Sequence, residues 1–402
     1  MLIKDQDIIV TGLQPWDIDI GSNCKNIALE FSKNNRVLYV NAALDRMTLL
    51  RRKNDPKVQK RRRILHGAEP DLIELAPNLW NLFPKTLLES INQIKSDRLF
   101  DWLNKINNRR MAKQILSAVA RLGFKDYIIF CDSDMFRSFY LKEMLHPKAF
   151  IYYTRDNMIA VDYWKTQGIR VEAAMMKNAD VVVANSTYLA KLAEAFNPHS
   201  YYVGQGCDVS IFDRTLIDRI PEDMKPILET GKPVIGYIGA LKTLRLNISV
   251  LQHIAKERPD WNLVLVGPED ENFKDSDLHQ SENVYFLGNK TEPELPLYLA
   301  TFDVAINPQI MNEVTIGNYP RKIDEYLAMG KPVVATKTEA MSVFADYVSL
   351  AASAEDYVSM IGKELENNTL AKIKEREEFA RMHTWENNVI NIGKALRKVI
   401  SL

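Results

Sequence analysis

Short apolar runs that alternate with helix-length stretches limit the folds open to this chain. The runs are almost continuous in Val, Ile and Tyr, as in DIIVTG (7–12), YIIFCD (127–132), AFIYYT (149–154), KPVIGYIG (232–239) and KPVVAT (331–336). Such continuous runs are typical of strands buried on both faces of a parallel sheet. Strands that alternate with helices indicate βαβ units, so the pattern predicts an α/β fold.

The length of the chain and a break in this pattern indicate how it divides. A length of 402 residues favours two domains. Between 209 and 230 the alternation stops, and this charged stretch contains two prolines before a new apolar run begins. We therefore expect Rossmann-like domains at 1–208 and 231–383, a linker at 209–230, and an amphipathic helix at 384–402.

The composition excludes several classes of protein. Lys plus Arg and Asp plus Glu both total 52, so no net charge attracts nucleic acid and we expect no nucleic-acid partner. The three cysteines (Cys24, Cys131 and Cys207) form no CxxC pair, which argues against a zinc or disulfide framework and fits a reducing compartment. No apolar run reaches the roughly 18 residues that a membrane-spanning helix needs. We therefore expect a cytoplasmic location.

The stretch NPQIMNEVTIGNYPRKIDEYLAMGKPVVAT (307–336) is the most informative part of the sequence. Pro320 ends a loop, and a helix is expected from Arg321 up to the next apolar run. The N–H groups and the dipole at such a helix start, together with Arg321 and Lys322, favour the binding of a phosphate. Glu325, about one turn further on, can accept two hydrogen bonds from a ribose diol. The alternative is that Glu325 is an ordinary solvent-facing residue of the helix.

The same stretch resembles a known family. EYLAMGKPVVAT is similar to the E-A-M-A-x-G-x-P-V-V signature of GT-B glycosyltransferases. YPRKIDEYLAMGKPVVAT resembles the P-x-K-x-x-E-Y-x-A-x-G-x-P-V-V pattern of their bacterial surface-polysaccharide branch, which is group 1-like. Other segments resemble family motifs in the expected order: VVVANSTYLAKLA (181–193), GQGCDVSIF (204–212), YIGALKTLRLN (237–247) and HTWENNVINIGKAL (383–396).

The resemblance implies two Rossmann-like domains that face a cleft, with the C-terminal helix crossing back to the first domain. It implies that the first domain binds a glycan acceptor, which is expected to be lipid-linked, and that the second binds a nucleotide-diphosphate sugar. The expected activity is transfer of the sugar in the synthesis of capsule, exopolysaccharide or another surface glycan. Two alternatives have the same fold: a non-catalytic nucleotide-sugar-binding protein and a nucleotide-sugar 2-epimerase.

No metal or other cofactor is expected for this transfer. The strings DID (17–19) and DSD (132–134) match the letters of the DxD motif of metal-dependent transferases. Both strings follow first-domain strands, away from the expected donor site, so we do not assign them as metal ligands.

The candidate donor-binding residues are positions that match the family pattern, together with charged and polar residues beside them. They are Gly239, Lys242, Arg245, Glu313, Asn318, Arg321, Lys322 and Glu325. Two positions depart from the family pattern. Gly317 stands where retaining members have a second glutamate, for which Glu313 is a candidate substitute, and Ala240 stands where the family has its first basic residue. The sequence therefore predicts a diphosphate clamp of Lys242, Arg245 and Lys322, and it leaves inverting and retaining transfer both open.

The acceptor candidates lie at strand ends of the first domain, because ligands of open α/β sheets bind at the carboxyl ends of strands. In the loop at 11–23, Gly12 allows a tight turn, and Trp16 and Asp17 are expected to overhang the cleft.

Asp156, after the strand at 149–154, is the candidate general base. A carboxylate there can take the proton of the acceptor hydroxyl in an inverting transfer. Tyr152 and Asp156 resemble a Y-x-x-x-D element of inverting enzymes that build exopolysaccharide. The alternative is that Asp156 pairs with Arg155 or caps a helix.

The segment RRKNDPKVQKRRR (51–63) holds eight basic residues and one acidic residue. One interpretation is a solvated, mobile loop. The other is a surface for anionic phospholipid or for a phosphate-bearing acceptor. Together with the zero net charge, the segment favours peripheral association with the inner face of the cytoplasmic membrane.

Overall fold

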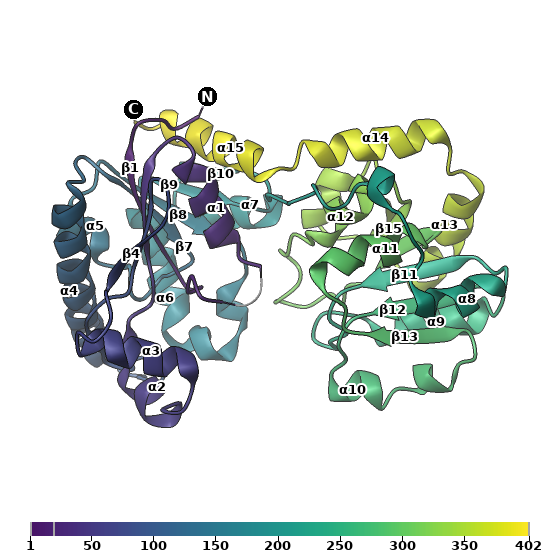
Figure 1. The fold of residues 1–402 in the computed structure, drawn as a ribbon, viewed down its shortest axis with the longest axis horizontal. Coiled ribbons are helices and arrows are strands. Elements are labelled where there is room, and N and C mark those ends of the chain that lie inside the picture. Colours follow the sequence, from purple (N-terminus) through teal and green to yellow (C-terminus); the bar gives the residue numbers. More distant parts are fainter. Residues whose placement is uncertain (1, 19–20, 401–402) are drawn as a thin grey trace. The chain divides into compact units, whose positions relative to one another are not determined.

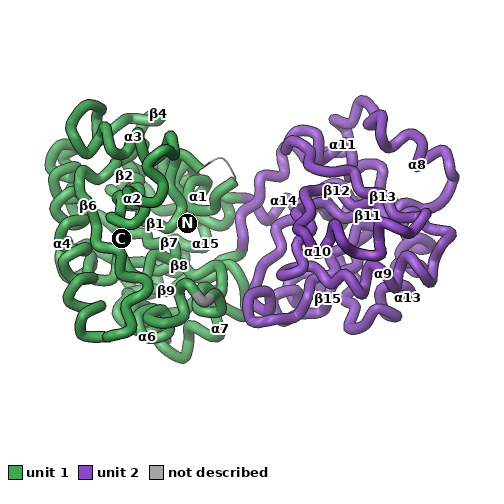
Figure 2. The backbone as a smooth tube through the Cα atoms, turned by 90° about the horizontal axis from the view of Figure 1, so that it is seen from below, with its two compact units in different colours: residues 1–204, 385–402 green, residues 205–384 purple. Residues whose placement is uncertain are grey.

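A computed structural model describes residues 2–18 and 21–400 and divides the chain into two compact units. Unit 1 comprises Met1–Gly204 and Trp385–Leu402, and unit 2 comprises Gln205–Thr384 (Figure 2). Residues 209–230, which we expected as a linker, lie within unit 2. There Met224 and Ile227 are buried in the core of that unit.

Unit 1 is built on an eight-stranded sheet in the order β10-β9-β8-β7-β1-β2-β5-β4 (Figure 1). Its strands are β1 (Asp7–Gly12), β2 (Arg36–Val40), β4 (Leu72–Ala76), β5 (Leu79–Leu82), β7 (Ile128–Asp132), β8 (Ala149–Thr154), β9 (Val181–Ala184) and β10 (Ser200–Tyr202). All neighbouring strands are parallel except β4 and β5. A separate parallel pair joins β3 (Leu44–Asp45) and β6 (Leu87–Leu88).

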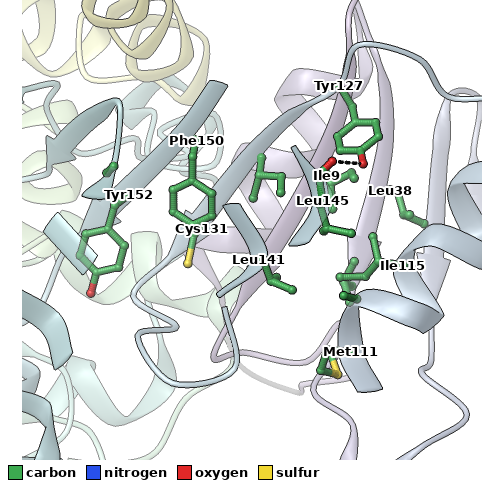
Figure 3. Packing of buried hydrophobic residues seen from close by; sticks show 14 of the residues in the cluster. Ile9, Leu38, Met111, Ile115, Tyr127, Cys131, Leu141, Leu145, Phe150 and Tyr152 are labelled. Atoms are coloured by element: carbon green, nitrogen blue, oxygen red, sulfur yellow. Dashed lines mark hydrogen bonds between the residues drawn. The ribbon is translucent and has the colours of Figure 1, made fainter. Parts of the chain in front are cut away.

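Helices cover both faces of the unit 1 sheet. They are α1 (Asn23–Ser32), α2 (Arg46–Arg51), α3 (Pro56–Leu65), α4 (Asp97–Leu122), α5 (Leu141–Leu145), α6 (Asp162–Asn178), α7 (Thr187–Glu194) and α15 (Trp385–Arg397), with the 3-10 turn η1 (Met158–Ala160). Helix α4 packs on the face that carries Ile9 and Phe150 (Figure 3). Helices α1 and α15 pack on the opposite face, so the C-terminal helix returns to the first domain as the resemblance implied.

Unit 2 has a second sheet, in the order β13-β12-β11-β14-β15-β16, and its pairs are all parallel. Its strands are β11 (Val234–Ile238), β12 (Asn262–Val266), β13 (Val284–Gly288), β14 (Val304–Asn307), β15 (Val333–Thr336) and β16 (Ser349–Ala351). Its helices are α8 (Lys225–Glu229), α9 (Ile248–Glu257), α10 (Glu271–Lys274), α11 (Leu295–Ala300), α12 (Lys322–Ala328), α13 (Ala354–Glu366) and α14 (Leu370–Arg381). Its 3-10 turns are η2 (Arg214–Leu216), η3 (Glu222–Met224), η4 (Asp277–Gln280), η5 (Glu292–Glu294) and η6 (Ala340–Phe344). The predicted α/β class with parallel sheets in two domains is confirmed.

The basic segment 51–63 is largely helical, so its interpretation as a mobile loop is wrong. Asp55 caps α3 by accepting hydrogen bonds from the backbone N–H groups of Lys57 and Val58. Val58 and Ile64 are buried and fix the helix on unit 1. Within the described residues, no helix is both long and apolar enough to cross a membrane.

Candidate functional site

Helix α12 carries the predicted donor-binding residues, and Tyr326 attaches it to the end of strand β11. The Tyr326 hydroxyl accepts a hydrogen bond from the Ile238 N–H at 2.9 Å and donates one to the Ile238 carbonyl at 3.2 Å. Because this contact fixes the helix against β11, the first residue of α12 lies beside the loop that follows β11.

Lys322 occupies this position and has an unusual environment. Its Nζ donates a hydrogen bond to the Tyr237 hydroxyl and lies 3.9 Å from the centre of the Tyr237 ring. Burial lowers the pKa of Lys322 to about 7, since the charged amine loses hydration; Arg245 lowers it further, whereas Glu325 opposes the shift. A cation with this little hydration is poised to bind an anion.

Glu325 lies one turn along α12 from Lys322. Its carboxylate accepts a hydrogen bond from Arg321 Nε at 3.2 Å, and its side chain is 13% exposed. Burial raises the pKa of Glu325, although the charges of Arg321 and Lys322 act in the opposite direction. The structure therefore brings Arg321, Lys322 and Glu325 together, as the motif suggested.

Two glycines let the backbone approach Lys322 closely. Gly239 has a φ of 142°, and a Cβ atom there would lie 2.6 Å from Lys322 Nζ. Gly267, at the end of β12, has a φ of 149°, and its Cβ would lie 2.0 Å from the Gly239 carbonyl oxygen. Only glycine tolerates both the backbone conformation and the contact. The sequence prediction included Gly239 and missed Gly267, which is the first residue after an apolar run.

The other predicted donor residues lie in two loops. Arg245 is close enough to Lys322 to affect its pKa, while Lys242 is exposed earlier in the same loop. Glu313 is exposed and Asn318 is half-buried in the segment before α12. That segment contacts the Arg245 loop, because the Asn312 side chain donates a hydrogen bond to the Leu244 carbonyl at 2.9 Å.

Sequence reasoning missed a contact between an aspartate and a histidine beside the site. Asp324, next to Glu325 in the chain, is fully buried, and its Oδ1 lies 2.6 Å from His383 Nδ1. Tyr319 donates a hydrogen bond to the other carboxylate oxygen at 2.9 Å. These contacts connect α12 to the last residues of unit 2 and make Asp324 a positioning residue. The HTW motif includes His383 but gave no sign of this partner.

In unit 1, the structure places the predicted acceptor residues in internal contacts. A Cβ on Gly12 would lie 2.8 Å from Cys24 Sγ. Trp16 packs edge-on against Tyr39, with ring centres 5.1 Å apart. Asp17 forms a two-point ion pair with Arg61, at 2.7 and 3.0 Å.

Asp156 belongs to a chain of charges at the carboxyl end of the unit 1 sheet. Arg155 lies between two carboxylates: Nε is 2.9 Å from buried Asp132, and Nη1 is 2.9 Å from Oδ2 of Asp156. Burial raises the pKa of Asp132 although Arg155 opposes that shift. Asp156 is 36% exposed, and within the described part of the chain no hydrogen bond engages its Oδ1. Both the predicted base and its predicted pairing with Arg155 are thus compatible with the geometry.

Within the described residues, the two DxD-like strings form no metal centre. Among residues 2–18 and 21–400, no group of three or more His, Cys, Asp and Glu side chains is placed to hold a metal ion. Asp134 of the DSD string pairs with Arg137 at 3.1 Å. Asp19 of the DID string lies outside the described residues.

The fold and the residues around α12 define a protein class. The chain has the GT-B fold, and residues 232–367, which lie within unit 2, match the family model of glycosyl transferases group 1. The resemblance seen in the sequence is thereby confirmed. A relative in Bacillus subtilis (strain 168) is TuaH, which is assigned to teichuronic acid biosynthesis as a glycosyltransferase. It is 27% identical over 226 residues, which cover 53% of this chain and 56% of TuaH.

Solved structures resemble the chain over almost its whole length. Sucrose-phosphate synthase from Thermosynechococcus elongatus has a TM-score of 0.66 at 14% identity, covering 98% of this chain and 99% of that one. HepE of Anabaena, solved in complex with UDP-glucose, has a TM-score of 0.61 at 15% identity, covering 98% and 99%. A UDP-forming trehalose-phosphate synthase from Burkholderia vietnamiensis has a TM-score of 0.68 at 10% identity, covering 99% of both chains. At these identities the likeness establishes the fold.

Proposed function

We propose that this protein is a glycosyltransferase that moves a sugar from a nucleotide-diphosphate donor to a glycan acceptor in surface-polysaccharide synthesis. The observation that carries the proposal is the assembly of Lys322, Glu325 and Gly239 within a group 1 glycosyltransferase domain. The assignment of TuaH to teichuronic acid biosynthesis supports the process, and the UDP-glucose bound to HepE supports the donor class. We infer a lipid-linked acceptor and a cytoplasmic location.

The proposed donor chemistry follows from charge. Departure of a nucleoside diphosphate builds negative charge on its phosphate oxygens, which cations in a site of low hydration stabilise strongly. We assign this role to Lys322 and Arg245, with Lys242 from the same loop as Arg245. We propose that Glu325 binds the ribose diol and that no metal ion is needed.

The proposed transfer inverts the anomeric centre. The acceptor hydroxyl attacks the anomeric carbon, its proton passes to the Asp156 carboxylate, and the bond to the nucleoside diphosphate breaks. Oδ1 of Asp156 is the atom available to take the proton. Retaining members of the family have a second glutamate at the position of Gly317, and this chain has a glycine there.

Thermal unfolding against a panel of nucleoside diphosphates and nucleotide sugars tests the donor proposal. A ligand at a hundredfold excess over its Kd should add about 2.7 kcal/mol to the free energy of unfolding. We expect the nucleotides of one base to raise the unfolding temperature. A chelator should leave this increase unchanged. Loss of that shift with chelator would overturn metal independence, and no shift with any compound would favour a non-catalytic protein.

Replacing Glu325 with Ala should weaken the binding of the nucleotide identified by thermal unfolding by about 1.5–3 kcal/mol, because a charge-assisted contact to the ribose is lost. Isothermal calorimetry measures the change. Glu257→Ala, which removes an exposed glutamate at the end of α9, is the matched control and should bind as the wild type does. Unchanged affinity in Glu325→Ala would remove Glu325 from the site.

We also propose that the basic segment 51–63 binds the anionic membrane surface. Arg61 is held by Asp17 and Arg63 by Glu69, whereas Lys53 and Arg62 are exposed. The double variant Lys53→Gln, Arg62→Gln should bind phosphatidylglycerol vesicles more weakly, most clearly at low salt. Lys372→Gln, Lys374→Gln on α14 removes the same charge from unit 2 and serves as the control in vesicle sedimentation. Equal loss in both variants would mean that the segment has no special role.

A further inference from the structure

A large cavity lies within unit 1. Its volume is about 750 Å³, within the range of small-molecule sites. It is lined by residues that follow the carboxyl ends of β1, β6 and β7, and by the β3–α2 segment and the start of α6. The ends of β1 and β7 belong to the edge of the eight-stranded sheet, where ligands of open α/β sheets bind. The cavity does not include Trp16 or Asp17.

One wall of the cavity presents an aromatic surface on a rigid support. Tyr163 is 58% exposed, and its ring meets Trp164 edge-on with centres 4.9 Å apart. Trp164 packs in turn on buried Phe136, with ring centres 5.2 Å apart. Exposed rings on a fixed base offer an apolar face to the C–H face of a sugar, at low cost in side-chain entropy.

The carboxylates of the cavity already have partners. Asp45 accepts hydrogen bonds from Ser90 Oγ at 2.6 Å and from the Thr48 N–H at 3.0 Å. Glu89 lies between Arg46 and Arg110, at 2.8 and 2.9 Å. The third carboxylate, that of Asp134, pairs with Arg137 as described above. These contacts hold the polar wall in place without a ligand.

Two cations of the cavity differ from this pattern. Arg51 and Arg52, at the end of α2, line the cavity and are exposed. In the part of the chain that the structure describes, neither guanidinium has a hydrogen bond or an ion pair. Planar guanidinium groups bind carboxylate and phosphate groups with matching geometry. The cavity thus combines a sugar-binding face with an unused site for an anionic group.

We propose that this cavity binds an acidic saccharide as the acceptor, with a sugar ring against Tyr163 and Trp164 and its carboxylate or phosphate on Arg51 and Arg52. The inference rests on the proposed transferase function and specifies the acceptor class. It also separates two parts of the basic segment: its first two arginines recognise the acceptor, whereas Lys53 and Arg62 face solvent.

Calorimetry on the full chain without a donor tests the proposal. The probes are trigalacturonate against neutral maltotriose, and glucose 6-phosphate against glucose, so that the two pairs distinguish a carboxylate from a phosphate. We expect one acidic probe to bind at least tenfold more tightly than its neutral partner. Arg51→Gln, Arg52→Gln should abolish that preference and leave the neutral probe unchanged, and Arg51→Lys, Arg52→Lys should restore part of it. Tyr163→Ala should weaken the binding of both the acidic probe and its neutral partner.

Arg109→Gln is the matched control, because it removes an exposed arginine of α4 that does not line the cavity, and it should bind as the wild type does. Equal affinity of the wild type and Arg51→Gln, Arg52→Gln for the acidic probes would overturn the proposal, and so would absence of saccharide binding by the folded wild type. If the wild type still binds a nucleoside diphosphate in that case, the transferase proposal stands and only the acceptor site fails. If the wild type binds the acidic saccharide but no nucleoside diphosphate, the saccharide site in the cavity stands and the transferase proposal fails.

Discussion

Asp156→Asn should lower the turnover number about 10²- to 10⁴-fold, the usual contribution of a general base. The amide can still accept the hydrogen bond from Arg155, but it cannot take the proton of the acceptor hydroxyl. Arg155 keeps its ion pair with buried Asp132, so the local structure should persist. Steady-state kinetics with the donor identified by thermal unfolding measure the change.

The affinity for the nucleotide should be unaltered in this variant, because the proposed donor residues belong to unit 2. Glu194→Gln, at an exposed position at the end of α7, is the matched control and should have wild-type turnover. Full activity of Asp156→Asn would contradict the base assignment. A loss of nucleotide binding as large as the loss of turnover would point instead to a general structural effect.

The parts of the fold that were predictable from the sequence depend on local patterns. The runs at 7–12 and 149–154 became β1 and β8 because apolar side chains on both faces of a strand need cover on both faces. Lys322 and Glu325 stand three positions apart, so any helix through them presents both on neighbouring turns. The relative position of these two side chains was therefore predictable from the motif alone.

The parts that were missed depend on contacts between distant residues. Asp324 and His383 are 59 positions apart, and each one alone is an ordinary polar residue of a helix or a loop. Arg61 and Asp17 are 44 positions apart and form an ion pair with each other. Both were expected to bind ligands, but in the structure they join a helix to a loop. The cavity is likewise assembled from segments that only the sheet brings together. Composition and periodicity contain no information on such pairs.

Lys322→Met should weaken nucleoside diphosphate binding about 10- to 150-fold at pH 7, equivalent to about 1.5–3 kcal/mol for a charge-assisted contact. The change removes the ammonium group and keeps an unbranched side chain of similar length. Lys331→Met is the matched control in unit 2. Burial also lowers the pKa of Lys331, to about 8, but its Nζ donates to the carbonyls of Ala300 and Phe302, so nucleotide affinity should persist.

The pH dependence of binding gives a second readout for Lys322. Its pKa of about 7 in the free protein should rise when the anionic diphosphate binds, since an opposite charge favours the ammonium form. Below pH 7 the amine is already protonated, so its contribution is constant. Above pH 7 binding must take up a proton, so affinity should fall up to about tenfold per pH unit, while the phosphate, with a second pKa of about 6, no longer titrates. Calorimetry in buffers of different ionisation enthalpy should detect this uptake near pH 8 in the wild type and in Lys331→Met, and not in Lys322→Met. The same proton uptake in Lys322→Met would show that another group titrates and that Lys322 does not bind the diphosphate.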